Sequence, residues 1–363
     1  MIETIKRATS LFCKDYRFSY DNAPVTVHNL DTLRRVNIVK SRLFLKHTRP
    51  NYYPLFPSIE LTNYCNLKCP VCPTGTGIMT RKRQAMNPAL FQEIWRELDK
   101  FALTCCLWNW GEPLLHPEIG AILKIASNSR TATILSTNGQ NLNSPKVIDA
   151  LVRYPVQRLI VALDGITDET LSVYRVGAKL APALEGVEAI RHHRKGKYPI
   201  LDMRFIAMKH NEHEIPYLKL WATTHGFDLL SIRTLSECGS SLEDNHSSLT
   251  PKDEKYQGYE YKYGIKQKND NFSCQKIFMN PCIDVNGEVT PCEQDYQAEI
   301  TYGNVKDNTF CDIWFGDKAR TIRENILKDR NIYYMCRECI FADRKSVNCT
   351  AECHELRGGY GLS

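Results

Sequence analysis

Short apolar runs and amphipathic stretches alternate along residues 57–235. Six runs have the length and composition of buried strands, SIELT, LTCCLWNW, TATILST, VQRLIVALD, ILDMRFIAM and FDLLSIRTL. Helical periodicity lies between them, over residues 87–101, 117–129, 144–154, 181–195 and 212–224. Asn87-Pro88 and His116-Pro117 mark two helix starts, with proline at the first helical position. This alternation predicts an α/β fold in which a parallel sheet with crossover helices curls into a partial (β/α)6 TIM-like barrel.

The sequence outside this run divides into three further parts. Residues 1–50 predict a short N-terminal helical extension. Residues 236–271 are polar and rich in tyrosine, without sustained periodicity, which indicates a linker or lid. Residues 272–363 are rich in cysteine and poor in apolar side chains, which is typical of a small domain that depends on metal for its stability. The barrel is therefore predicted to span residues 51–235.

The composition is that of an ordinary soluble globular protein. Of 363 residues, 43% are apolar and 24% are charged, and the net charge is +6. This mild charge suits an anionic small substrate but is too diffuse to argue for nucleic acid. The N-terminal stretch lacks a signal-peptide pattern, and no run approaches the roughly 20 apolar residues that span a bilayer. We therefore expect a cytoplasmic protein that binds neither nucleic acid nor membrane.

Fifteen cysteines need an explanation, because cytosolic proteins rarely form disulfides and their clustered cysteines are more often metal ligands. The segment CNLKCPVC holds Cys65, Cys69 and Cys72. A [4Fe–4S] cube has four irons, so three thiolates hold it and leave one iron open for a substrate or cofactor. The segment follows a predicted strand and would lie at the carboxyl end of the barrel, where barrel active sites are built.

The CNLKCPVC segment resembles the cluster loop of the radical S-adenosylmethionine (SAM) superfamily, although Val71 stands where an aromatic residue is common. The resemblance implies that the open iron binds SAM and that electron transfer into SAM releases a 5'-deoxyadenosyl radical, which abstracts a substrate hydrogen. It also implies an electron donor such as flavodoxin or ferredoxin. The alternative is a three-ligand zinc site or half of a zinc ribbon, but no fourth Cys or His follows at ribbon spacing.

Further strand ends resemble family segments that bind SAM. WNWGEP is similar to the Gly-Gly-Glu-Pro motif, with Trp110 in place of the first glycine. The resemblance gives Gly111 a close backbone approach and Glu112 a hydrogen bond from the SAM ammonium, with Pro113 completing the motif. STNG and ALDG resemble segments that line the ribose and methionine of SAM. These two segments and the sequence just after ALDG supply the remaining candidates, Ser136, Thr137, Asn138, Asp164 and Arg175.

The C-terminal cysteines resemble the SPASM extension of radical SAM enzymes, although one gap is longer and the last cysteine of the pattern is missing. On that pattern a first auxiliary [4Fe–4S] cluster is held by Cys274, Cys282, Cys292 and Cys353. A second, one ligand short, is held by Cys336, Cys339 and Cys349. The shorter twitch arrangement has one auxiliary cluster, on Cys274, Cys292, Cys336 and Cys339. We favour two clusters, because the twitch arrangement leaves Cys349 and Cys353 without a role. A zinc ribbon on the last four cysteines is a further alternative.

Auxiliary clusters accept electrons, so the resemblance implies a radical SAM oxidoreductase. Glu293 resembles the acidic residue that some family members use as a base, and burial beside a cluster predicts a raised pKa for its carboxyl. Arg81, Lys82 and Arg83 follow the cluster loop and would suit an anionic group. Together with the short N-terminal segment, they favour a small polar or anionic substrate, such as a sugar or aminocyclitol, over a peptide.

Three other functions stay open. A maturase of a ribosomally made peptide or protein carries the same modules. A redox-neutral epimerase would use Cys238, just past the sixth predicted strand, to donate a hydrogen atom to the substrate radical. A non-catalytic iron–sulfur electron carrier or scaffold would explain the cysteines, but not the GEP, STNG and ALDG segments at successive strand ends.

Overall fold

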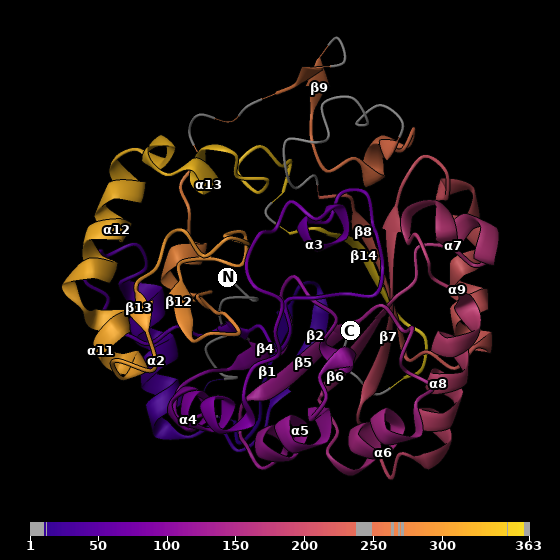
Figure 1. The fold of residues 1–363 in the computed structure, drawn as a ribbon, viewed down its shortest axis with the longest axis horizontal. Coiled ribbons are helices and arrows are strands. Elements are labelled where there is room, and N and C mark those ends of the chain that lie inside the picture. The colour runs from indigo at the N-terminus through magenta and orange to yellow at the C-terminus, as the bar shows by residue number, and fades with distance from the viewer. Residues whose placement is uncertain are drawn as a thin grey trace.

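A single sheet of ten strands runs through the part of the chain that the computed structural model describes, which is residue 11 and residues 13–236, 249–262, 265–267, 269, 272–346 and 348–358. Six parallel strands form its centre, β3 (Ser58–Ile59), β4 (Thr104–Cys106), β5 (Ala132–Thr137), β6 (Arg158–Ala162), β7 (Ile200–Ala207) and β8 (Leu229–Thr234). The sheet curls, with helices on its outside (Figure 1). All six predicted strands and the partial barrel are confirmed.

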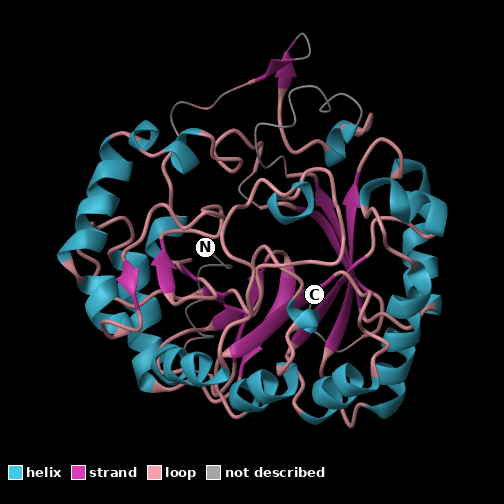
Figure 2. Ribbon diagram, in the orientation of Figure 1, coloured by secondary structure: helices cyan, strands magenta, loops and turns pink. Residues whose placement is uncertain are grey.

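The crossover helices lie where the periodicity predicts them, at α4 (Pro88–Leu98), α5 (Ile119–Ser127), α6 (Pro145–Arg153), α8 (Leu180–His193) and α9 (Ile215–Thr224). They form the outer layer of the fold (Figure 2). Their apolar faces pack on the sheet and bury side chains such as Phe91 and Trp95 of α4. The short helices α3 (Pro73–Thr76) and α7 (Asp168–Tyr174) escaped prediction, because a helix of one or two turns shows little periodicity.

The N-terminal segment is only partly helical. A hairpin of β1 (Tyr16–Tyr20) and β2 (Ala23–Val27) precedes α2 (Thr32–Leu43). Asp21 and Asn22 make its two-residue turn with φ values of 56° and 58°, a left-handed conformation that Asp and Asn tolerate. The prediction of a helical extension is therefore wrong for the hairpin. Strands of five residues carry too short an alternation to stand out from the polar sequence around them.

The cysteine-rich segment extends the same sheet at both edges. On one edge β11 (Cys282–Ile283) pairs parallel to β3, and β12 (Glu288–Thr290) and β13 (Gly303–Asn304) follow antiparallel. On the other edge β14 (Thr350–Glu355) pairs antiparallel to β8. The helices of this segment are α11 (Phe310–Phe315), α12 (Asp317–Lys328) and α13 (Tyr334–Arg337). β11 and β12 form a hairpin, and α11 and α12 follow it along the chain.

The predicted linker or lid is described only in part. A small antiparallel pair, β9 (Tyr261–Lys262) with β10 (Ile265–Lys266), lies away from the main sheet (Figure 1). Single 3₁₀ turns complete the described chain, at Pro113–Leu115, Glu212–Glu214, Glu254–Tyr256, Lys276–Phe278 and Arg330–Ile332. No helix among the described residues is both long enough and apolar enough to cross a membrane.

Replacing Asn87 by alanine is expected to lower the free energy of unfolding by about 1 kcal/mol. The Asn87 side chain accepts a hydrogen bond from the Ala89 N–H at 2.8 Å and so caps α4. Ser144 is the matched control, because it precedes α6 in the same extended conformation but its side chain makes no capping hydrogen bond. Denaturant unfolding of both variants measures the difference, and equal losses would contradict the capping role of Asn87.

Candidate active site

A cavity of about 580 Å³ lies against the inner face of the curled sheet. Cys65, Cys69 and Cys72, on the loop between β3 and α3, all line it. The Sγ of Cys65 accepts hydrogen bonds from the Leu67 N–H and from the Asn138 amide, each at 3.4 Å. The loop is tight, because a Cβ on Gly75 would lie 2.5 Å from the Cys69 carbonyl oxygen. The three predicted cluster ligands therefore share one cavity.

The burial of these thiols suits ligands of an iron–sulfur cluster better than free thiols. Burial raises the pKa of Cys65 and also that of Cys69, which reaches about 11 with Cys72 and Cys65 nearby. The raised pKa values mean that burial disfavours the thiolate form. A bound metal overcomes this cost, because a coordinating thiol loses its proton outright. Among the described residues no three His, Cys, Asp or Glu side chains converge as ligands of one metal ion. A cube asks for a different arrangement, with thiolates around a space for several irons.

Glu112 connects the predicted SAM-binding segments. Its Oε1 accepts hydrogen bonds from Thr137 Oγ1 at 2.7 Å and the Leu114 N–H at 3.0 Å, and its Oε2 accepts one from the Asn138 N–H at 2.7 Å. Burial raises the pKa of Glu112, while these hydrogen bonds oppose the rise. Glu112, Ser136, Thr137 and Asn138 all line the large cavity. The structure thus brings the GEP and STNG segments together with the cluster loop.

The backbone on either side of Glu112 is closely packed, which holds Glu112 in place. A Cβ on Gly111 would collide with the carbonyl of Thr62, so only glycine allows this backbone approach. The Thr62 hydroxyl also donates to the Glu112 carbonyl at 2.9 Å. Pro113 is buried and begins a 3₁₀ turn. Gly111 therefore lies close to the backbone of Thr62, between β3 and the cluster loop.

Asp164 lies behind the cavity wall. Its carboxylate is fully buried, and its Oδ2 lies 2.6 Å from Nε of Arg175. Its Oδ1 accepts a hydrogen bond from the Ile206 N–H at 2.7 Å. Arg175 itself lines the cavity. Direct contact of Asp164 with SAM is therefore not supported by this geometry, and Asp164 acts on the cavity through Arg175.

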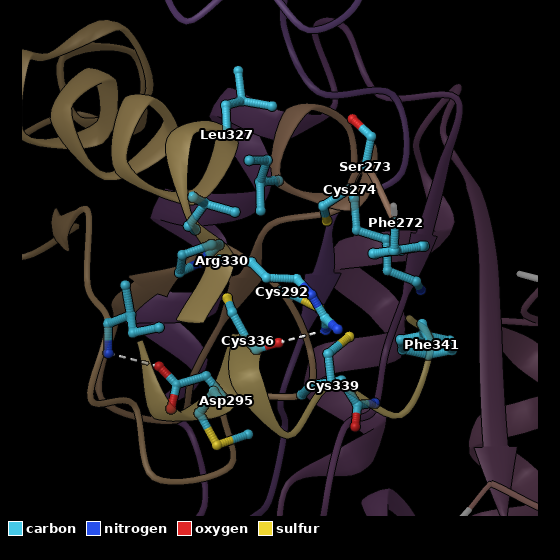
Figure 3. A pocket seen from close by; sticks show the side chains of 17 residues that line it. Phe272, Ser273, Cys274, Cys292, Asp295, Leu327, Arg330, Cys336, Cys339 and Phe341 are labelled. Atoms are coloured by element: carbon cyan, nitrogen blue, oxygen red, sulfur yellow. Dashed lines mark hydrogen bonds between the residues drawn. The ribbon is translucent and has the colours of Figure 1, made fainter. Parts of the chain in front are cut away.

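A second cavity, of about 270 Å³, collects four of the C-terminal cysteines. Cys274, Cys292, Cys336 and Cys339 line it, together with apolar side chains such as Phe341. Figure 3 shows these cysteines around the same space, although they come from distant parts of the segment. Burial, with Cys274 and Cys339 nearby, raises the pKa of Cys336 to about 12. Four thiols of this kind fit one fully ligated cluster.

The other three C-terminal cysteines do not line this cavity, so the four thiols that do are those of the twitch arrangement. Cys282 is buried in β11, beside Ser58 of β3. Cys353 lies on β14 with its Sγ 3.7 Å from the Ser231 hydroxyl, and Cys349 has its Sγ 3.6 Å from the Ser236 hydroxyl. Cys282 and Cys353 lie in edge strands, and the spacing along the chain contains no sign of this pairing. Among the described residues no three cysteines converge as ligands of one metal ion, which disfavours a zinc ribbon on the last four cysteines.

Glu293 lines the large cavity, but its predicted pKa shift is wrong in direction. Burial alone would raise the pKa of Glu293, as the sequence predicts. Lys276 forms an ion pair with its carboxylate, and this charge holds the pKa below its ordinary value. Lys276, which the sequence analysis missed, lines the same cavity. A lysine several residues from Glu293 in sequence gives no local signal of this contact.

Two further predictions about the substrate end differ from the structure or fall outside it. Arg81 is largely buried, and its guanidinium pairs with Glu60 at 2.8 Å and Asp284 at 3.1 Å. These ion pairs hold the Arg81 side chain in one arrangement, while Lys82 and Arg83 are exposed. The anionic-substrate argument therefore loses Arg81. Cys238, the hydrogen-atom donor of the epimerase alternative, lies outside the described residues.

Comparison with known proteins agrees with this geometry. The family model described as the Radical SAM superfamily matches residues 59–218, and one described as an iron–sulfur cluster-binding domain, SPASM, matches residues 274–340. The PqqA peptide cyclase of Gluconobacter oxydans (strain 621H) is 21% identical over an alignment of 326 residues, and the match covers 84% of this chain and 88% of that protein.

Solved structures share the fold. SuiB of Streptococcus suis bound to S-adenosylmethionine superposes with a TM-score of 0.60 at 17% identity, covering 80% of this chain and 71% of that one. BtrN in complex with AdoMet and 2-DOIA superposes with a TM-score of 0.53 at 19% identity, covering 83% of this chain and 99% of that one. At such identities the likeness concerns the fold alone.

Replacing Cys65, Cys69 and Cys72 together by alanine is expected to remove about four irons and abolish SAM binding. Iron analysis and equilibrium binding of SAM to the anaerobically reconstituted protein measure both effects. The C-terminal iron should remain, because its four thiols lie around a separate cavity. Cys13→Ala, at an exposed thiol, is the control. Unchanged iron content in the triple variant would refute the assignment of the first cluster.

The wild-type protein is expected to hold about eight irons, and the double variant of Cys336 and Cys339 to alanine about four. The matched control changes Cys349 and Cys353, the two thiols on or beside β14, to alanine and should keep all iron. A wild-type content of about twelve irons, or a loss of about four from the control, would restore the two-cluster arrangement.

Proposed function

Because this chain belongs to the radical SAM superfamily and carries a SPASM domain, we propose that it oxidises a small polar or anionic substrate in the large cavity. One observation carries the proposal. The cluster loop, the GEP and STNG segments and the Glu293–Lys276 pair all line that cavity, and Cys292, the neighbour of Glu293, lines the second one. Hydrogen removal and electron removal would therefore take place at adjacent sites.

The two domains imply a [4Fe–4S] cluster that binds SAM, and auxiliary iron–sulfur ligation. Cys65, Cys69 and Cys72 would hold the first cluster, and the four cysteines of the smaller cavity would hold one auxiliary cluster. When bound, the SAM cluster supplies a 5'-deoxyadenosyl radical that removes a substrate hydrogen atom, and the auxiliary cluster supplies an acceptor for the second electron. All protein ligands proposed for this pair of clusters are cysteines of this chain.

Glu112 and Arg175 are suited to the two charged groups of the SAM methionine, its ammonium and its carboxylate. The Glu112 carboxylate can accept hydrogen bonds from an ammonium group, and the Arg175 guanidinium can donate to a carboxylate. Both side chains are held in place, Glu112 by Thr137 and Asn138 and Arg175 by Asp164. Preorganised partners of this kind orient a cofactor without rearrangement of the protein.

Glu293 is the proposed base. Its carboxylate lies in the cavity wall and can accept the proton that the substrate loses after hydrogen abstraction. Lys276 holds the carboxylate in position and donates to it. The Trp110 indole N–H donates to the Glu293 carbonyl at 2.7 Å, so the backbone at Glu293 is fixed to the GEP segment. The proton acceptor thus lies between the SAM-binding wall and the auxiliary cysteines.

Peptide maturation is the second candidate function. A curated relative whose match covers 84% of this chain is a peptide cyclase, and SuiB has also been solved bound to the precursor peptide SuiA. A peptide would still present its reacting carbon to the same cavity. The products separate the two functions, since a maturase changes the mass of a peptide and leaves sugars and aminocyclitols unchanged.

Reduced, reconstituted protein with SAM and a suitable substrate is expected to form 5'-deoxyadenosine and an equal amount of product lighter by a pair of hydrogens. Glu293→Gln should still form 5'-deoxyadenosine but should lower product formation about 100-fold or more, because a general base contributes at least that much. Chromatography with mass spectrometry measures both compounds.

Glu299→Gln is the control for this experiment, because Glu299 is exposed and close to Glu293 in sequence. It should leave both compounds unchanged. Absence of 5'-deoxyadenosine from every reaction would refute radical SAM chemistry. Normal product formation by Glu293→Gln would refute the role of Glu293 while leaving the radical chemistry in place.

A further inference from the structure

Three arginines line the inner face of neighbouring strands. Arg158 lies on β6, Arg204 on β7 and Arg233 on β8, and all three line the same cavity as the cluster loop. Their side chains are only 2%, 10% and 19% exposed, respectively. Burial of a guanidinium costs free energy unless a carboxylate or a ligand compensates its charge. Three of them on adjacent strands therefore need an explanation.

The arginines share too few carboxylates. Asp21 Oδ2 lies 2.6 Å from Arg233, 3.0 Å from Arg204 and 4.0 Å from Arg158. Asp202 Oδ2 lies 3.2 Å from Nε of Arg158. Three guanidinium groups thus face two carboxylates, and one positive charge is left over. Within the described part of the chain, Nε of Arg204 is buried and has no hydrogen-bond partner.

Asp21 shows that the three arginines can bind a carboxylate. It lies at the tip of the β1–β2 hairpin, and one of its carboxylate oxygens is within ion-pair distance of all three guanidinium groups. Its other oxygen accepts a hydrogen bond from the Thr350 hydroxyl at 2.9 Å, which anchors the hairpin tip to β14. A single carboxylate is thereby held against the arginines, and Asp21 and the three arginines all line the cavity.

The other cations of the cavity wall have their own partners. Lys276 is paired with Glu293, and Arg175 is paired with Asp164. The surplus positive charge is therefore concentrated at the Arg158–Arg204–Arg233 group, which we call the arginine wall. The pKa of Arg204 falls to about 10 through burial and the nearby Arg233, so its guanidinium is still charged at neutral pH.

We propose that the arginine wall binds an oxyanionic group of the substrate, a carboxylate or a phosphate ester, beside Asp21. Guanidinium groups suit both, because their planar fork donates two parallel hydrogen bonds to two oxygens of the anion. A substrate held there would extend across the cavity toward the cluster loop. The anion would decide which carbon faces the SAM site. This proposal rests on the proposed function for the statement that the cavity's ligand is the substrate.

The test is titration of the reconstituted, SAM-loaded protein with inorganic phosphate and, separately, with acetate, by calorimetry. SAM is present so that its own carboxylate site is filled. At least one anion should bind, and the tighter of the two distinguishes a phosphate ester from a carboxylate. Arg204→Gln should weaken binding about tenfold or more, as expected for a lost charged hydrogen bond. Asp21→Asn should tighten it by a similar factor, because it removes a competing negative charge.

Arg153→Gln, on the exposed face of α6, is the matched control and should bind as the wild type does. Iron content and circular dichroism show whether each variant is folded. If Arg204→Gln does not fold, anion binding by Asp21→Asn provides the test. Failure of the wild-type protein to bind either anion, equal binding by Arg204→Gln and the control, or unchanged binding by Asp21→Asn would each overturn the proposal. SAM cleavage without anion binding refutes the arginine wall alone, whereas anion binding without SAM cleavage refutes the radical function alone.

Discussion

Two backbone pairings hold the C-terminal segment on opposite edges of one sheet, and the candidate active site depends on both. β11 extends the sheet beside β3, and β14 closes it beside β8. Unpaired N–H and C=O groups at a sheet edge are an exposed template for further strands, so each pairing also covers an edge. The cysteine-rich segment thus begins and ends on the partial barrel. It brings Glu293 to one side of the large cavity and Cys349 to another.

Trp110 joins the two predicted iron–sulfur sites. Its carbonyl accepts a hydrogen bond from Thr74, just after the cluster loop, and its indole N–H donates to the Glu293 carbonyl. Its ring also packs edge-on against Tyr296. A glycine, which the family pattern places at this position, has no side chain to make the indole hydrogen bond or the ring contact. The departure from the pattern therefore couples the GEP segment to the loop that carries Cys292.

Charge inside the fold follows two regimes. Arg81 with Glu60 and Asp284, and Arg175 with Asp164, are compensated pairs. Buried pairs of this kind return little net stability, because desolvation of both partners offsets their attraction, and their effect is to hold side chains in one arrangement. The arginine wall is different, since its guanidinium groups outnumber the carboxylates that face them. An excess of buried charge is costly to the fold and is relieved by an anion of opposite sign.

The local patterns of the sequence determined the six strands, the helices between them and the cluster loop. Apolar runs, helix starts and three cysteines within eight residues all need only a short stretch of chain. Tertiary structure decided which distant cysteines meet, and that Asp21 lies among three arginines of other strands. Spacing along the chain does not reveal which strands pair at a sheet edge. The spacing therefore favours two auxiliary clusters, whereas Cys349 and Cys353 lie beside and on β14 and do not line the smaller cavity. In the same way, an arginine within an apolar strand carries no mark of its partners until strand order and register bring them together.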